Sequence, residues 1–126
     1  MSKQPIQTDS APAAIGPYSQ GIKTGNLIFT SGQMPLVPET MELIDESIEK
    51  ATMRCLDNIK AILEASGAGM SDVVKCVVFL TNMSDFAVMN GVYASYFDET
   101  PPARSCVQVA GLPRGARIEI EAIAVV

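Results

Sequence analysis

Residues 72–81 read DVVKCVVFLT, and this stretch decides the fold class. β-Branched residues dominate it, as is typical of a strand, and its apolar side chains fall on both faces instead of alternating with polar ones. Both faces of such a strand must be buried by packing against other parts of the protein. We therefore predict that residues 72–81 form the central strand of a sheet.

Amphipathic helices are predicted on either side of this strand in the sequence. In residues 47–66 apolar side chains recur at intervals of three and four, and Gly67 and Gly69 end the pattern. A second helix follows, with Ser84 or Asp85 as its cap. The positions that mark the second helix are Phe86, Met89, Asn90, Tyr93, Tyr96 and Phe97.

Further strands are predicted toward both ends of the chain. Residues 20–23 and 27–31 flank the turn residues Thr24-Gly25-Asn26, which are suited to a hairpin. Residues 104–110 and 117–126 form two more strands, joined by a turn over residues 111–115. Prolines predict an extended arm over residues 1–17, and residues 32–43 form a loop.

The resulting order is strand, strand, helix, strand, helix, strand, strand. It predicts one α+β domain over residues 1–126, with both helices packed on one face of a mixed sheet. The second face then has no helix to cover it, although the strand over residues 72–81 is apolar on that side too. We expect this face to pack against another subunit, so the protein is predicted to be an oligomer.

Composition narrows the chemistry that the chain can perform. It has 126 residues, a formal net charge of −5 and no histidine, which excludes Ser-His-Asp triads, Cys-His dyads and His-ligated zinc. The negative charge and the lack of a basic cluster disfavour nucleic-acid binding. Three cysteines without a CxxC pair, no signal peptide and no long apolar segment predict a soluble cytoplasmic protein without a membrane partner.

Alternation in the last two predicted strands suggests a polar site. It places Arg104 and Cys106 on one face of their strand, with Val107 and Val109 on the other face, toward the helices. On the next strand Glu119 faces away from the core. We expect Arg104 and Glu119 to lie on adjacent strands, either as a structural ion pair or as a pocket that binds a carboxylate substrate and activates a water.

Four sequence runs resemble the RidA (YjgF) family. They are IGPYSQG (residues 15–21), FTSGQ (29–33), PARSCV (102–107) and IEIEAIA (118–124), in the family's order and spread over nearly the entire chain. The resemblance implies a chorismate-mutase-like homotrimer with active sites between subunits. It also implies hydrolytic deamination of 2-imino and enamine acids, such as 2-aminoacrylate, 2-iminobutanoate and 2-iminopropanoate, to 2-keto acids and ammonia, with no metal or cofactor.

The resemblance also implies roles for particular residues. Arg104 matches the arginine that binds the substrate carboxylate, Glu119 the glutamate assigned to the hydrolytic water, and Tyr18 a tyrosine of the pocket. Cys106 matches a cysteine whose backbone helps to bind substrate. Further lining positions of the pocket are Ser31, Gly32, Gln33 and Asn90.

Two other functions remain open at this point. One is a trimer that binds small carboxylates, or acts as a chaperone, without turnover. The other is an RNA-acting protein, because some members of the family are described as ribonucleases and translation inhibitors. The net charge of −5 and the absence of histidine speak against the second function.

Overall fold

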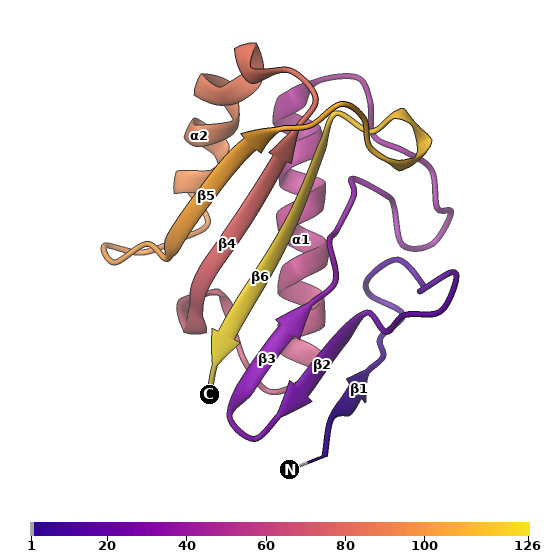
Figure 1. The fold of residues 1–126 in the computed structure, drawn as a ribbon, viewed down its shortest axis with the longest axis vertical. Coiled ribbons are helices and arrows are strands. Elements are labelled where there is room, and N and C mark those ends of the chain that lie inside the picture. Colours follow the sequence, from indigo (N-terminus) through magenta and orange to yellow (C-terminus); the bar gives the residue numbers. More distant parts are fainter. Residues whose placement is uncertain (1) are drawn as a thin grey trace.

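The computed structural model describes residues 2–126, which contain one mixed sheet with two α-helices behind it (Figure 1). The strands are β1 (Gln4–Ile6), β2 (Gly21–Thr24), β3 (Leu27–Thr30), β4 (Val73–Leu80), β5 (Ala103–Gln108) and β6 (Ile118–Val125). Their order in the sheet is β1-β2-β3-β6-β4-β5, and β4 and β5 are the one parallel pair of neighbours among these residues. The predicted α+β class with two helices is confirmed.

The first strand was not predicted. Gln4–Ile6 pairs antiparallel with β2 and forms the edge of the sheet, where we expected only an extended arm. Pro5 lies opposite Ile22 in this pair. An edge strand tolerates proline because one side of its backbone needs no ladder partner, so the prolines that argued against regular structure do not prevent it.

Helix α1 (Ile48–Ala65) matches the predicted helix to within one residue at each end. Ser47 caps it by accepting a hydrogen bond from the Lys50 backbone N–H at 3.1 Å. Gly67, with φ of +86°, turns the chain away just after the helix ends. No helix within residues 2–126 is long and apolar enough to cross a membrane.

Helix α2 (Phe86–Ala94) is shorter than the predicted second helix, so Tyr96 and Phe97 lie beyond its end. Asp85 occupies its N-cap position, but the side chain makes no capping hydrogen bond. A 3-10 turn, Met83–Asp85, leads into the helix, and the Asn82 side chain accepts the Ser84 backbone N–H there. The helix begins where we predicted, and Asn82, a residue outside our prediction, caps the 3-10 turn that precedes it.

Strand β4 is an interior strand, flanked by β6 and β5, although it lies one position from the edge and not at the centre of the sheet. Its alternate residues are buried against the helices, as are those of β6. The buried members of β6 are Ile118, Ile120, Ala122 and Ala124, the predicted core face of that strand.

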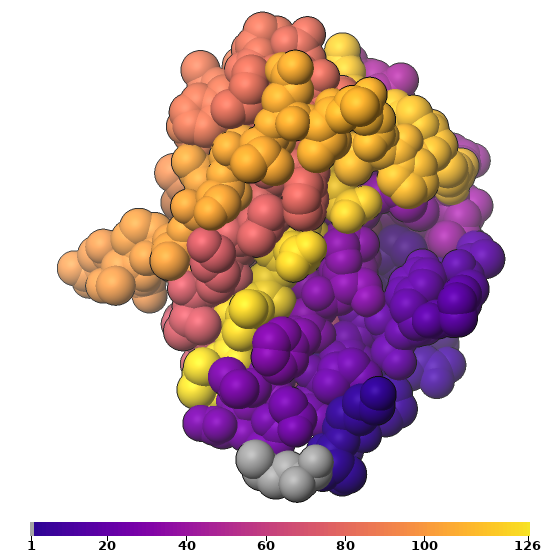
Figure 2. Space-filling model, viewed as in Figure 1, coloured from indigo at the N-terminus to yellow at the C-terminus, as the bar shows by residue number. Residues whose placement is uncertain are grey.

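Among residues 2–126, no helix lies on the opposite face of the sheet, as we predicted (Figure 1). Phe29 is 39% exposed and Val107 is 43% exposed, and Glu119 and Glu121 also project from this side. Figure 2 shows this face, with β6 running diagonally across it in yellow. Large apolar side chains left in solvent on one side of a sheet are typical of a surface that another molecule covers.

Candidate active site

The orientation of β5 is the reverse of our prediction. Cys76 of β4 lies in register with Arg104 on one side and with Ala122 on the other, and both Cys76 and Ala122 are buried in the core. Arg104 and Cys106 therefore point toward the helices, while Val107 projects from the open face. We had placed the valines against the core by hydrophobicity alone, whereas α2 presents aromatic rings on which the arginine stem and guanidinium pack.

Arg104 lies in a pocket formed largely by α2. Its Nη1 donates to Asn90 Oδ1 at 2.6 Å. The guanidinium carbon is 4.8 Å from the centroid of the Tyr93 ring and 5.5 Å from that of Phe86. Cys106 of β5 packs against the core beside them. Arg104, Asn90, Tyr93, Phe86 and Cys106 are called the arginine group below.

Arg104 has no acidic partner within 4.0 Å among residues 2–126. The ion pairs found within residues 2–126 join Lys50 to Glu46 and Arg117 to Asp45, and both are on the surface. A half-buried guanidinium that donates to an amide oxygen and packs on aromatic rings, without an ion-pair partner in this part of the chain, has a positive charge available for an anionic ligand. Arg104 also borders a cavity of about 520 Å³.

Glu119 and Gly32 are in contact and belong to a second cluster of predicted site residues. A Cβ atom at Gly32 would overlap the Glu119 carboxylate, so the carboxylate lies directly against the Gly32 backbone. Burial, and to a lesser degree the charge of Glu121, raise the pKa of Glu119. A carboxyl group that keeps its proton to higher pH than usual is suited to exchange protons with a substrate or a water near neutral pH.

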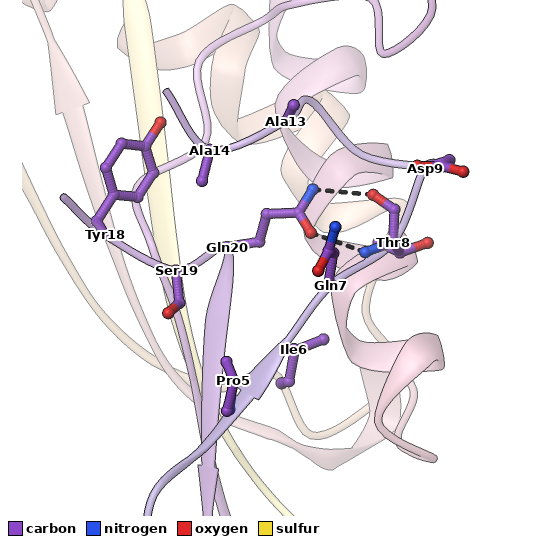
Figure 3. A pocket seen from close by; sticks show the side chains of 10 residues that line it. All are labelled: Pro5, Ile6, Gln7, Thr8, Asp9, Ala13, Ala14, Tyr18, Ser19 and Gln20. Carbon is purple, nitrogen blue, oxygen red and sulfur yellow. Dashed lines mark hydrogen bonds between the residues drawn. The ribbon is translucent and has the colours of Figure 1, made fainter. Parts of the chain in front are cut away.

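Tyr18 is placed beside this second cluster by the N-terminal arm. It borders a cavity of about 340 Å³ together with Gly32, and its hydroxyl accepts the Ile15 backbone N–H at 3.2 Å. The arm is tied down by the buried Gln20 carboxamide, which accepts the Thr8 N–H at 2.8 Å and donates to the Thr8 carbonyl at 3.0 Å. Figure 3 shows these bonds, with the Tyr18 ring on the other side of a neighbouring pocket.

Ser31 and Cys106 have structural contacts of their own. The Ser31 hydroxyl donates to the Ser19 carbonyl and so joins the end of β3 to the segment that carries Tyr18. Ser31, Tyr18, Gly32 and Glu119 are called the glutamate group below. Burial raises the pKa of the Cys106 thiol although Arg104 opposes the shift, so the thiol is protonated and the structure gives it no nucleophilic role.

The two groups lie on different faces of the sheet, which corrects the predicted pairing of Arg104 with Glu119. Strand β4 separates β5 from β6, so their strands are not adjacent. Glu119 and Val107 are both in register with Phe79 and share the open face, whereas Arg104 is on the helix face. Neither cavity that Tyr18 borders includes Arg104. A single chain therefore holds the predicted site residues in two separate places.

Three residues around the site were not among our candidates. The sequence pattern indicates Phe86 and Tyr93 only as positions of a helix, and Gln20 only as part of a strand. The spacing of Phe86, Asn90 and Tyr93 is i, i+4, i+7, which places all three on one side of α2, and this was a signal for the arginine pocket. Nothing comparable in the sequence indicated that Gln20 anchors the arm.

The raised pKa of Glu119 has a consequence for stability. Because this pKa is higher in the folded chain than in the unfolded one, ionisation of Glu119 favours unfolding, and stability falls as the pH rises through the folded value. Glu119→Gln cannot ionise. It should therefore unfold at a higher temperature than the wild type at about pH 7.5, and the gain should shrink toward about pH 4, where both states of the wild type are mostly protonated.

Thermal unfolding across this pH range, followed by circular dichroism, measures the effect. Glu39→Gln, in an exposed loop, is the control for removing one negative charge. A gain in Tm that stays the same from pH 7.5 to about pH 4, or no gain at all, would show that Glu119 is not destabilised by its surroundings.

Comparisons with known proteins agree with the motifs. The family model described as Endoribonuclease L-PSP matches residues 8–126. The chain is 52% identical over 128 aligned positions to the 2-iminobutanoate/2-iminopropanoate deaminase of Escherichia coli (strain K12), covering 99% of this chain and 98% of that protein.

Solved structures agree with the fold as well. The crystal structure of E. coli TdcF with bound serine has a TM-score of 0.94 at 48% identity and covers 98% of each chain. The crystal structure of RidA from the Antarctic bacterium Psychrobacter sp. PAMC 21119 has a TM-score of 0.94 at 51% identity, covering 98% of this chain and 99% of that one. The protein belongs to the RidA (YjgF) family.

Proposed function

We propose that the protein hydrolyses 2-imino and enamine acids, such as 2-iminobutanoate, 2-iminopropanoate and 2-aminoacrylate, to 2-keto acids and ammonia. The observation that carries this proposal is the unpaired Arg104, a cation in a chain of net charge −5 whose guanidinium has no carboxylate partner within residues 2–126. Its planar fork matches the carboxylate of such a substrate. The relative named for this reaction and the relative with bound serine support a small ligand with an α-carboxylate.

The chemistry needs few groups because a protonated imine is already electrophilic. Arg104 holds the carboxylate while one water attacks the C=N carbon, and the Glu119 carboxylate takes a proton from that water. The carbinolamine that forms then receives this proton on nitrogen, the C–N bond breaks, and the hydroxyl proton passes to the Glu119 carboxylate as the C=O bond forms. Glu119 returns that proton to the departing ammonia. One protonated imine and one water therefore yield one keto acid and one ammonium ion, with no oxidant, metal or cofactor in the balance.

The same proposal includes a homotrimer with a chorismate-mutase-like arrangement. Arg104 and Glu119 cannot meet within one chain, because they lie on opposite faces of the sheet. The open face beside Glu119 exposes Phe29 and Val107, as a surface awaiting a partner would. We assign the complete site to the cleft between subunits, where the arginine group of one subunit meets the glutamate group of another.

Gly32→Ala should separate catalysis from folding. The backbone of Gly32 does not have a positive φ, so alanine is permitted there, but the new Cβ must push the Glu119 carboxylate aside. We expect kcat to fall about tenfold or more while Tm changes by only a few degrees, because the displaced atoms are the flexible end of a side chain.

Gly91→Ala is the matched control for this variant. Gly91 lies within α2, and a Cβ there would meet nothing within 4 Å. It should keep full activity and gain about 0.5–1 kcal/mol of stability from the better helix propensity of alanine. Equal activity of the Gly32→Ala variant and the wild type would show that catalysis does not depend on the position of the Glu119 carboxylate beside Gly32.

A direct assay tests the proposed activity. 2-Iminobutanoate or 2-aminoacrylate is generated in situ by an amino-acid oxidase or a dehydratase, and keto-acid release is followed with and without the protein. A rate above that of the buffer supports the deaminase. A rate equal to that of the buffer, with keto-acid binding intact, would instead support the alternative of a carboxylate-binding protein without turnover.

We also propose that the protein works in the cytoplasm and does not act on RNA. Its three cysteines are free thiols, which fits a reducing compartment. The net charge of −5 is unfavourable for phosphate contacts, despite the endoribonuclease name of the family model. Cleavage of a single-stranded RNA at a rate above that of the Glu119→Gln variant would contradict this assignment.

A further inference from the structure

The Arg104 guanidinium is enclosed by one side of α2. Phe86, Asn90 and Tyr93 are spaced so that two helical turns bring all three to the same side of the helix. The rings of Tyr93 and Phe86 lie 4.8 and 5.5 Å from the guanidinium carbon, within the range of a cation–π interaction. The helix therefore provides two aromatic surfaces and one hydrogen-bond acceptor for the same cation.

The Tyr93 ring is itself held firmly. The residue is only 5% exposed, and its ring centroid is 4.7 Å from that of Phe97. Its hydroxyl is buried beside the Cys76 thiol, yet it makes no hydrogen bond to any of residues 2–126 within normal limits. Because the Tyr93 hydroxyl makes no hydrogen bond within this part of the chain, we attribute the contact of Tyr93 with the Arg104 guanidinium to the ring.

The contacts leave a defined part of the guanidinium free. Arg104 uses Nη1 to bind Asn90, while Nε and Nη2 make no hydrogen bond to residues 2–126. Nε and Nη2 form one edge of the planar guanidinium and can bind both oxygens of a carboxylate. Arg104 also borders the cavity of about 520 Å³ that Asn90 and Tyr93 line.

We propose that Tyr93, assisted by Phe86, is a positioning residue that stacks on the Arg104 guanidinium and, with Asn90, keeps its Nε–Nη2 edge turned to the ligand carboxylate. This inference rests on the proposed function, since it takes the carboxylate of the imino acid as the ligand. Removing the ring frees the guanidinium to rotate, which weakens carboxylate binding without touching the reacting carbon.

Binding measurements on two matched variants test this role. Tyr93→Phe keeps the ring and removes only the hydroxyl, while Tyr93→Leu removes the ring. The probes are 2-oxobutanoate, the keto acid that 2-iminobutanoate would yield, and 2-oxobutanamide, which lacks the carboxylate. We expect Tyr93→Leu to weaken 2-oxobutanoate binding by about three- to tenfold and to leave 2-oxobutanamide unchanged, with Tyr93→Phe close to the wild type.

In the imine assay, Tyr93→Leu should raise KM more than it lowers kcat, and Tyr93→Phe should restore the wild-type KM. An equal loss of affinity for both probes, or equal affinities of the leucine and phenylalanine variants for 2-oxobutanoate, would overturn the proposal. If Tyr93→Leu does not fold, Phe86→Leu removes the second ring and should weaken 2-oxobutanoate binding selectively in the same way.

A spectroscopic readout separates this inference from the proposed function. The ¹⁵Nε–¹Hε signal of Arg104, assigned by its absence in Arg104→Ala, should be displaced by ring currents in the wild type and in Tyr93→Phe, and should move toward the free-arginine position in Tyr93→Leu. An unmoved signal in Tyr93→Leu contradicts the stacking itself. If the signal moves but wild type and Arg104→Ala bind 2-oxobutanoate equally, the stacking is correct and the carboxylate role of Arg104 fails.

Discussion

Arg104→Ala should lower kcat/KM for 2-iminobutanoate by about 10²-fold or more. The wild-type guanidinium offers a bidentate, charge-assisted contact to the substrate carboxylate, and two such hydrogen bonds together are worth about 3 kcal/mol or more. Alanine also removes this cation, which would attract an anionic substrate, from a protein of net negative charge. Steady-state kinetics with imine generated in situ measures the loss.

Arg104→Lys is the informative companion variant. It keeps the charge but loses the planar fork, so it should recover only part of the activity that alanine removes. Light scattering and thermal unfolding show whether each variant keeps its assembly and fold. Full activity of Arg104→Ala in an intact oligomer would mean that another group binds the carboxylate.

Glu119→Gln should lower kcat by about 10²- to 10³-fold with a smaller effect on KM. Glutamine cannot take a proton from the attacking water, and general acid–base catalysis is typically worth about that factor. The same substitution should stabilise the fold near neutral pH, because the pKa of Glu119 is raised by burial and by Glu121. A variant that gains stability as it loses activity is typical of a strained functional group.

The pH dependence of the wild-type rate offers an independent check. If Glu119 must be ionised to accept a proton, kcat should rise with pH through a pKa above the ordinary value of 4.5. Glu119→Gln should lose this rising limb. Retention of the same limb in Glu119→Gln would assign it to a different group, and an unchanged kcat would remove Glu119 from the mechanism.

The elements of the fold could be predicted because their local signals are strong. Periodicity defined α1 to within one residue at each end, a run of β-branched residues located β4, and alternation of apolar and polar residues located β6. Strand β1 was missed because three residues at a sheet edge, one of them Pro5, are held by pairing with β2 and not by any pattern of their own. The periodicity of apolar residues in a sequence reflects which side chains are buried. A strand that is held at the edge of a sheet by backbone pairing leaves little of this pattern.

The site was harder to predict than the fold. Alternation on β5 correctly grouped Arg104 with Cys106, but it does not say which face of the sheet they occupy, and hydrophobicity gave the wrong answer for Val107. That valine is exposed within the chain, on the face where we propose another subunit. The order of strands also separates Arg104 from Glu119, and strand order depends on long-range pairing that a single sequence does not reveal.

The proposed active site requires Arg104 of one subunit to work with Glu119 of another. Mixing the Arg104→Ala and Glu119→Gln variants tests it most directly. The two inactive proteins, carrying different tags, are unfolded together and refolded at equal concentration, and mass spectrometry confirms that mixed oligomers form. A site that takes its arginine and its glutamate from different subunits is then intact in about one quarter of cases, because each requirement is met by half of the subunits.

We therefore predict that the mixture recovers about one quarter of the wild-type rate of 2-iminobutanoate hydrolysis, while each variant refolded alone stays inactive. Mixed oligomers that remain as inactive as the separate variants would contradict the account. They would show that each active site takes both residues from the same chain.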